Sequence, residues 1–381
     1  MRRSWLLALA AALALSCPAL AQETVKIGLL VPLTGPAAAD GLSVLNAVKI
    51  AVDRVNAAGG VLGKKVELVY YDDRTDPKEA VAVAYKLIEK DKVVAAVGGS
   101  YSMPTRAVAP IFQESRIPLV AAYAVHPDIT KAGEYCFRNG FLGTVEGAAA
   151  GHVAVEMLKA KRVAILTMDN DFGRTLDEGF RKYVQDKGVE VVYEKLYPLA
   201  EKDYKPYLSA IKEAKPDLIF VAGYYAQAGN IVRQAKEIGL NVQILGEEGF
   251  DSPKFLEIAG DAAEGVIIVT NLNRDDPRPV VQEFVKEYKA RYNIIPDMVG
   301  ASAYDAFMII VDAIRRAGTT EPDKVRKAIA ETKGFDGLTG VINGFTEIGE
   351  VVKPVQVQIV KGGDFKFFGV VDDPAIITPR H

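Results

Sequence analysis

The sequence of 381 residues has few of the residue types that hold metals. It contains two Cys and three His, namely His126, His152 and His381, and no ligand spacing joins them. Structural zinc and iron–sulfur sites need clusters of such residues, so the pattern argues against a metal centre. No motif suggests an organic cofactor either, and we expect the protein to use none.

An excess of charge of one sign is also missing. The chain carries 46 basic and 49 acidic residues, which gives a net charge of −3, and no basic block stands out along it. Proteins that bind nucleic acid concentrate Lys and Arg on one surface, so we expect no nucleic-acid partner. No stretch after the N-terminal segment reaches 18 uninterrupted apolar residues, and we therefore expect the exported chain to be soluble.

The N-terminal segment has the pattern of an export signal. Arg2 and Arg3 precede an apolar stretch at residues 5–15, which is too short to span a bilayer as a helix. Small residues at Ala19 and Ala21 suit a signal peptidase, so residues 1–21 are interpreted as a signal peptide and cleavage is expected after Ala21. The mature protein is then expected in the periplasm.

Cys17 leaves a second interpretation of this segment open, in which a lipid-modified Cys anchors the mature protein. Ala14 stands where such signals usually have Leu, and this disfavours the lipoprotein. With either cleavage site Cys136 has no intramolecular disulfide partner in the soluble part, so we expect it to be a small buried residue.

From Val25 onward, apolar β-rich runs alternate with amphipathic stretches, which is typical of parallel sheets covered by helices. The predicted fold class is α/β, with two similar doubly wound parallel-sheet lobes. Strands are expected at 25–31, 65–71, 93–97, 118–121, 162–167, 189–193, 218–222, 243–245 and 266–269. Helices are expected at 42–57, 77–89, 105–113, 147–159, 175–185, 227–238, 279–292 and 301–316.

Two stretches look like copies of each other. A helix at 77–89 leads into the apolar run 93–97, and a helix at 204–214 leads into the apolar run 218–222. Each run ends in a polar, aromatic loop, and loops at the carboxyl ends of parallel strands are where such sheets bind ligands. The repeat therefore predicts two lobes with a ligand between them.

Five sequence blocks, in order, resemble the leucine/isoleucine/valine-binding family, the type I solute-binding proteins of ABC transporters. The blocks are 26–28 through 34–36, 56–63, 72–77, 246–249 and 259–265. The resemblance covers nearly all of the mature chain. It implies two lobes joined by a three-segment hinge, one from 22–142 plus 271–349 and the other from 143–270 plus 350–381.

The resemblance also implies a function and partners. Such proteins close their hinge around a small ligand and deliver it to the subunits of an ABC permease. We expect a monomer that captures a small hydrophobic amino acid of the branched-chain type.

Four residues match ligand-contacting positions of the family. Ser102 matches the Ser that holds the ligand's carboxylate, and the start of a helix near Thr105 adds positive potential there. Glu248 matches the acid that pairs with the α-ammonium group, and its neighbour Glu247 is the rival for that role. Tyr224 and Phe172 match aromatic walls of the site.

Other positions depart from the family pattern. The family usually has a Thr whose hydroxyl touches both charged ends of an amino acid. This chain has residues 122–125 there, including Ala124 and Val125, and Val125 supplies no hydroxyl. A lost hydrogen bond to a charged ligand costs about 1.5–3 kcal/mol unless water or Tyr123 replaces it. Tyr123 itself replaces a small residue and narrows the cleft or adds a phenol, and Asp40 replaces an aromatic cover of the side-chain pocket.

Because of these departures, two chemical classes of ligand remain open. An amino acid suits Glu248, whereas an aromatic or 2-oxo carboxylate, or an amide, suits the cluster of aromatic residues around Ser102. A hydrolase with Ser102 as nucleophile is disfavoured because no Gly-x-Ser-x-Gly motif surrounds it. A sensory ligand-binding domain would need a transmembrane segment or a partner protein.

Overall fold

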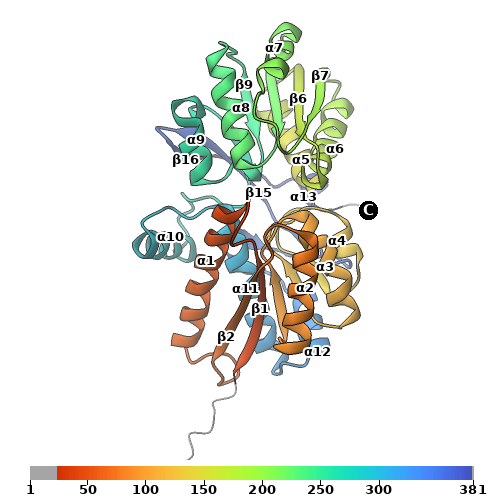
Figure 1. The fold of residues 1–381 in the computed structure, drawn as a ribbon, viewed down its shortest axis with the longest axis vertical. Helices are drawn as coiled ribbons and strands as arrows, with labels where there is room; N and C mark the ends of the chain where they lie inside the picture. The colour runs from red at the N-terminus through yellow and green to blue at the C-terminus, as the bar shows by residue number, and fades with distance from the viewer. Residues whose placement is uncertain (1–23, 380–381) are drawn as a thin grey trace, which may run out of the picture.

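The computed structural model describes residues 24–379, which form two lobes stacked one above the other (Figure 1). Each lobe is a sheet covered by helices. The chain passes between the lobes at three places, so both lobes are built from separated parts of the sequence. The expected signal peptide, Cys17 and the cleavage site lie outside the described residues.

The lower lobe of Figure 1 contains a five-stranded parallel sheet in the order β2-β1-β3-β4-β5. Its strands are β1 (Val25–Val31), β2 (Val66–Asp72), β3 (Ala95–Gly98), β4 (Leu119–Ala121) and β5 (Cys136–Arg138). The helices of this lobe are α1 (Ala38–Ala57), α2 (Pro77–Tyr85), α3 (Ser102–Glu114), α4 (Asp128–Lys131), α10 (Pro279–Tyr292), α11 (Met298–Ala317) and α12 (Pro322–Ala330). We call it lobe 1.

The upper lobe, lobe 2, contains a seven-stranded sheet in the order β16-β15-β10-β9-β8-β6-β7. Its strands are β6 (Arg162–Met168), β7 (Glu190–Tyr197), β8 (Leu218–Ala222), β9 (Gln243–Gly246), β10 (Ile267–Thr270), β15 (Val355–Lys361) and β16 (Asp364–Val371). Its helices are α5 (Gly143–His152), α6 (Asp171–Asp186), α7 (Lys205–Ala214), α8 (Tyr225–Glu237), α9 (Pro253–Ala259) and α13 (Pro374–Ile377).

The first five strands of both lobes follow the same order, 2-1-3-4-5 along the chain. The predicted fold class is confirmed, and the two stretches that look like copies in the sequence are α2–β3 and α7–β8, the same unit in each lobe. In a doubly wound sheet the strand order reverses between the first and third strands, and a crevice opens at their carboxyl ends. This places the loops after β1 and β3 opposite those after β6 and β8.

Local sequence explains where several helices begin. Asp76 caps α2 by accepting the backbone N–H groups of Lys78 and Glu79, and Pro77 follows at a position that needs no hydrogen bond from its nitrogen. The side chain of Asn170 caps α6 in the same way by accepting from Gly173. The core strands are apolar along their whole length because helices cover both faces of each sheet.

The C-terminal part contains strands that the sequence patterns did not predict. β15 and β16 join the sheet of lobe 2 in antiparallel orientation, next to β10. Four further short strands are β11 (Phe335–Gly337), β12 (Gly340–Ile342), β13 (Gly344–Phe345) and β14 (Val351–Val352), paired as two small antiparallel ribbons. Short ribbons of two or three residues carry too little periodicity to be recognised.

The three connections between the lobes follow β5, β10 and β14. They comprise residues 139–142, 271–278 and 353–354. The third begins after β14, because β14 pairs with β13 and Val351 packs in the core of lobe 1. The residue boundaries of the lobes stay a prediction.

Cys136 is buried in lobe 1, where its thiol donates to the carbonyl oxygen of Ala109 at 3.3 Å. Burial raises the pKa of this thiol to about 12. The residue therefore acts as a small apolar group of the core, as the sequence predicts.

Candidate functional site

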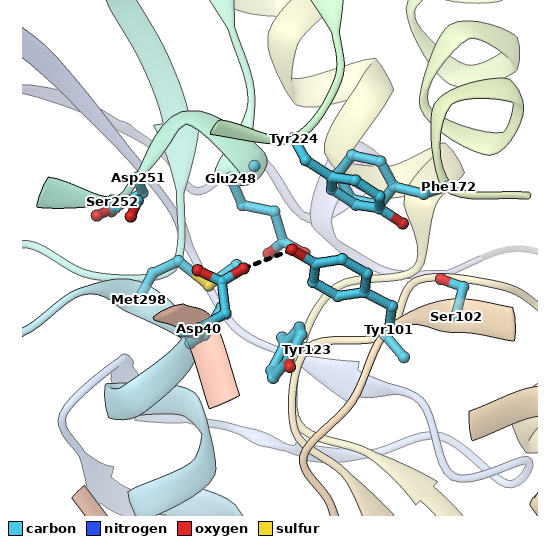
Figure 2. A pocket seen from close by; sticks show the side chains of 13 residues that line it. Asp40, Tyr101, Ser102, Tyr123, Phe172, Tyr224, Glu248, Asp251, Ser252 and Met298 are labelled. Atoms are coloured by element: carbon cyan, nitrogen blue, oxygen red, sulfur yellow. Dashed lines mark hydrogen bonds between the residues drawn. The ribbon is translucent and has the colours of Figure 1, made fainter. Parts of the chain in front are cut away.

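A cavity lies between the lobes, at the carboxyl ends of the central strands (Figure 2). Lobe 1 supplies one wall from the first turns of α1, α3 and α11 and from the loops after β3 and β4. Lobe 2 supplies the other wall from the loops after β6, β8 and β9. The lining residues are Asp40, Tyr101, Ser102, Tyr123, Ala124, Phe172, Tyr224, Glu248, Gly249, Asp251, Ser252, Met298 and Val299.

Seven of the eight residues expected to contact the ligand line this cavity, and Val125 does not. The side chain of Val125 packs into the core of lobe 2, close to Gly143. Its backbone N–H nevertheless reaches the site, where it donates to the Ser102 hydroxyl oxygen at 3.1 Å.

Ser102 is the first residue of α3, and this fixes what its hydroxyl can do. Because the oxygen already accepts from Val125, its proton remains available for an acceptor in the cavity. The first turn of α3 carries no acidic residue, so the positive potential of the helix N-terminus is not neutralised. Ser102 is therefore suited to bind a carboxylate.

Three aromatic rings from the two lobes meet in the cavity (Figure 2). Tyr101 of lobe 1 stacks on Tyr224 of lobe 2 with ring centroids 4.1 Å apart, and Phe172 lies 4.9 Å from Tyr224 on the other side. Offset pairs of this kind contribute about 0.5–1.5 kcal/mol each beyond the apolar area they bury. The stack therefore both lines the cavity and holds the lobes together.

Tyr123 narrows the cavity and keeps its phenol occupied. Its hydroxyl donates to the carbonyl oxygen of Gly99 at 2.9 Å, and its ring lies edge-on to Tyr101. The phenol proton is thus used inside lobe 1, and Tyr123 does not replace the hydroxyl that Val125 lacks. Ala124, next to it, accepts a hydrogen bond at its carbonyl oxygen from the buried Arg138.

The two neighbouring acids after β9 have different environments. Glu247 is fully buried, and its two carboxylate oxygens accept the backbone N–H groups of Gly223 and Gly249 at 2.8 and 2.6 Å. Glu248 lines the cavity, and its Oε2 accepts from Asn271 at 2.6 Å. Its Oε1 is buried without a hydrogen-bond partner among residues 24–379. The geometry thus assigns a structural role to Glu247 and leaves Glu248 free to pair with a ligand.

Burial and neighbouring acids strongly affect Glu248. Its pKa is raised well above the usual range, first by desolvation and then by Glu146 and Glu247, while Lys353 opposes the shift. The backbone N–H of Glu248 donates to Glu146 at 2.9 Å, which brings those two acids together. A cation placed beside Oε1 would favour the charged form of Glu248, so the site is suited to an ammonium group.

Two more acids lie at the cavity, and their neighbours differ. Asp251 forms a buried ion pair with Arg274 and accepts from Thr270 at 2.6 Å, so its charge is balanced. Asp40 accepts from the Tyr101 hydroxyl at 2.6 Å, and no Lys or Arg of the described chain pairs with it. Burial, and then Asp297, raise the pKa of Asp40 to about 7.

Contacts outside the cavity also join the lobes. Arg106 of α3 forms an ion pair of 3.1 Å with Asp171 of α6. The Tyr225 hydroxyl of lobe 2 donates to the carbonyl oxygen of Pro36 in lobe 1 at 3.1 Å. With the Tyr101–Tyr224 stack, these contacts describe a closed arrangement of the two lobes.

The sequence interpretation missed six lining residues. Tyr101 lies in the polar, aromatic loop after β3, and the composition of this loop could have indicated that Tyr101 contacts the cavity. Three of the missed residues lie within four positions after Glu248, namely Gly249, Asp251 and Ser252. Their closeness to Glu248 in the sequence could have indicated that they line the cavity. Met298 and Val299 begin α11, about 200 residues from the other contacts of lobe 1, and no local pattern marks them.

Two features are absent from the part of the chain that the structure describes. No group of three or more His, Cys, Asp or Glu residues there is arranged to hold a metal ion. Among residues 24–379, no helix is both long and apolar enough to cross a membrane.

Two doubly wound lobes with a lined cavity between them define a hinged protein that encloses a small molecule. The sequence profile of the periplasmic binding protein family matches residues 24–364, and the chain belongs to this family. The Leu-, Ile-, Val-, Thr- and Ala-binding protein of Pseudomonas aeruginosa is 32% identical over 87% of this chain and 88% of its own length.

Solved structures agree with this assignment. A leucine-binding protein from Thermotoga maritima superposes with a TM-score of 0.85 at 34% identity, covering 92% of this chain and 99% of its own. A solute-binding protein from Rhodopseudomonas palustris, solved with 3,4-dihydroxybenzoic acid, superposes with a TM-score of 0.83 at 29% identity, covering 92% and 97%. These relatives are binding proteins, and their ligands fall into two chemical classes.

Proposed function

We propose that this protein captures a small hydrophobic amino acid of the branched-chain type in the interlobe cavity and delivers it to an ABC permease. The observation that carries the proposal is the unpaired Oε1 of Glu248 in a cavity whose opposite side offers the Ser102 hydroxyl. Ser102 would bind the carboxylate of an amino acid, and Glu248 would bind its ammonium group.

The charge of the cavity supports an amine over a simple acid. No Lys or Arg is among its lining residues, whereas Asp40 and Glu248 both reach it, and within residues 24–379 neither forms an ion pair with a Lys or Arg. A ligand with only a carboxylate would add negative charge beside these acids. An amino acid brings its own cation and avoids that cost.

An aromatic or 2-oxo carboxylate is the second candidate. Four aromatic rings line the cavity, namely those of Tyr101, Tyr123, Phe172 and Tyr224, and a relative was solved with a dihydroxybenzoic acid. The raised pKa of Glu248 would let it bind such an acid in its neutral form. The charge balance of the cavity makes this the weaker of the two.

Capture and delivery follow from the hinge. Three connections join the lobes, and the cavity lies between the two lobes, so a ligand that contacts both walls favours the closed arrangement. We propose that a permease recognises this closed form, that the protein acts as a monomer, and that residues 1–21 direct it to the periplasm and are removed after Ala21.

The test compares L-leucine with its 2-oxo analogue, which keeps the carboxylate and loses the ammonium group. Residues 22–381 are freed of bound ligand by unfolding and refolding, and the melting temperature is measured with each compound. A ligand at about 100 times its Kd stabilises the folded state by about 2.7 kcal/mol, which gives a clear shift. We expect a shift with leucine, its loss in Glu248→Gln, and its retention in Glu257→Gln, an exposed acid of α9.

The opposite result selects the second candidate. If the 2-oxo acid shifts the melting temperature and leucine does not, the proposal that Glu248 pairs with an ammonium group is wrong. Screening would then move to aromatic and 2-oxo acids.

A further inference from the structure

One side of the cavity holds a buried acid that the binding of an amino acid's two charged groups does not use. Asp40 is 6% exposed and lines the cavity, and its Oδ2 accepts a hydrogen bond from the Tyr101 hydroxyl. Within residues 24–379 its Oδ1 accepts no hydrogen bond. Figure 2 shows the Asp40 carboxylate beside the Tyr101 hydroxyl, on the opposite side of that ring from Ser102.

The backbone holds Asp40 at this place. It lies in the first turn of α1, and the next residue, Gly41, packs against the loop that leaves β1. A Cβ atom on Gly41 would lie 1.8 Å from the carbonyl oxygen of Pro32, so only glycine permits this approach. The start of α1 and the Asp40 side chain on it are therefore tightly positioned.

Tyr101 fixes the orientation of the Asp40 carboxylate from the other side. Its ring is held between Tyr224 and Tyr123, and its hydroxyl donates to Oδ2. A carboxylate has about four acceptor positions, and one donor leaves the others to be satisfied from the cavity. Asp251 differs, since Arg274 and Thr270 already satisfy it.

We propose that Asp40, oriented by Tyr101, selects among small branched amino acids for those in which one branch carries a hydrogen-bond donor, a hydroxyl or a carboxamide. This inference rests on the proposed function, because it assumes that Ser102 and Glu248 hold the carboxylate and ammonium groups. A purely aliphatic side chain would leave Oδ1 of Asp40 without a partner in the occupied cavity. A site with a buried polar group discriminates against the analogue that lacks the matching donor.

Isosteric amino-acid pairs test this selection. Asparagine has nearly the shape of leucine, and threonine has nearly the shape of valine, so each pair differs mainly in its polar atoms. We expect the wild type, measured by calorimetry, to bind asparagine at least about tenfold tighter than leucine or threonine at least about tenfold tighter than valine. Asp40→Leu should reverse the preference in the pair that shows it.

A control variant and a second substitution complete the design. Asp53→Leu places the same change on an exposed acid of α1, and its preference should equal that of the wild type. If Asp40→Leu does not fold, Asp40→Ala carries the same expectation, and the comparison in the wild type still decides.

The outcomes separate this inference from the proposed function. If the wild type binds leucine and valine at least as tightly as their polar counterparts, or if the Asp40 variants leave the ratio unchanged, the inference is wrong and the proposed function stands. If no amino acid binds and the 2-oxo analogue of leucine does, the proposed function is wrong and the inference falls with it.

Discussion

The backbone N–H of Val125 donates a 3.1 Å hydrogen bond to the hydroxyl oxygen of Ser102. The contact joins the start of α3 to the loop after β4 in lobe 1. It occupies an acceptor position of the hydroxyl and leaves its proton free for the cavity. Val125 therefore supports the site through its backbone, although its side chain packs elsewhere.

Replacing Ser102 by Ala should weaken ligand binding without unfolding the protein. A hydrogen bond to a charged group contributes about 1.5–3 kcal/mol, so the Kd should rise by about 10-fold to 150-fold. Titration calorimetry measures the change. Ser115→Ala, at the exposed C-terminal end of the same helix, is the control and should leave the Kd unchanged. An unaltered Kd in Ser102→Ala would show that Ser102 does not bind the ligand.

Tyr224 should matter through its ring more than through its hydroxyl. Tyr224→Phe keeps both ring contacts and loses a weak bond from Asn170 of 3.3 Å, so the Kd should change by less than about threefold. Tyr224→Ala loses both ring contacts and should raise the Kd by about fivefold to 150-fold. Tyr85→Ala, at an exposed position of α2, is the matched control. Equal effects of the Phe and Ala variants would contradict this account.

The ion pair between Arg106 and Asp171 should contribute little to closure. The two side chains are 41% and 24% exposed, and pairs of this kind are worth about 0–1 kcal/mol. Arg106→Gln should thus raise the Kd by no more than about fivefold, and less at high salt. Arg174→Gln breaks a pair with Asp169 inside lobe 2 and should leave the Kd unchanged. A larger loss in Arg106→Gln would show that this pair dominates closure.

Asp40 should make the stability of the unliganded protein depend on pH. Its pKa is about 7 in the folded state and about 4 in the unfolded chain, so the folded state holds a proton that the unfolded state releases. The stability from this difference is complete below about pH 4 and is lost as the pH rises through about 7. Asp40→Asn stays uncharged, so its stability relative to the wild type should increase between pH 4.5 and 8.

The size of this effect has an upper limit. One pKa unit corresponds to about 1.4 kcal/mol, which gives at most about 4 kcal/mol for Asp40. Urea unfolding at several pH values measures the difference between Asp40→Asn and the wild type. Asp261→Asn, at an exposed position, should show no such trend. A difference independent of pH would mean that Asp40 is already ionised in the folded state near pH 5.

Most of the regular fold was predictable because long strands and amphipathic helices carry strong periodicity. The expected strands at 25–31 and 218–222 agree with β1 and β8 to the residue, and the helix at 279–292 agrees with α10. The antiparallel strands β15 and β16 were missed. β15 pairs with β10, about 90 residues earlier in the chain, and β16 joins the sheet only through β15. Pairing at such distances leaves little local trace in a sequence.

The candidate site likewise contains residues that the sequence could predict and residues that it could not. Ser102, Phe172 and Tyr224 directly follow or closely follow strands, so their place at the carboxyl edges could be inferred. Tyr101 was overlooked because its role depends on Asp40 and Tyr224, which come from other parts of the chain. The polar character of the cavity near Asp40 likewise arises from a contact between separated segments.

By itself, the sequence determined the α/β class, the two similar lobes and the chemical types of residue at the strand ends, because these depend on local periodicity and on recognisable blocks. The tertiary structure decided that Glu248 and not Glu247 lines the cavity, that Val125 reaches it through its backbone alone, and that Met298 and Val299 belong to one wall. Those facts depend on how two lobes, each assembled from distant segments, meet across one cavity. Only long-range packing sets that geometry.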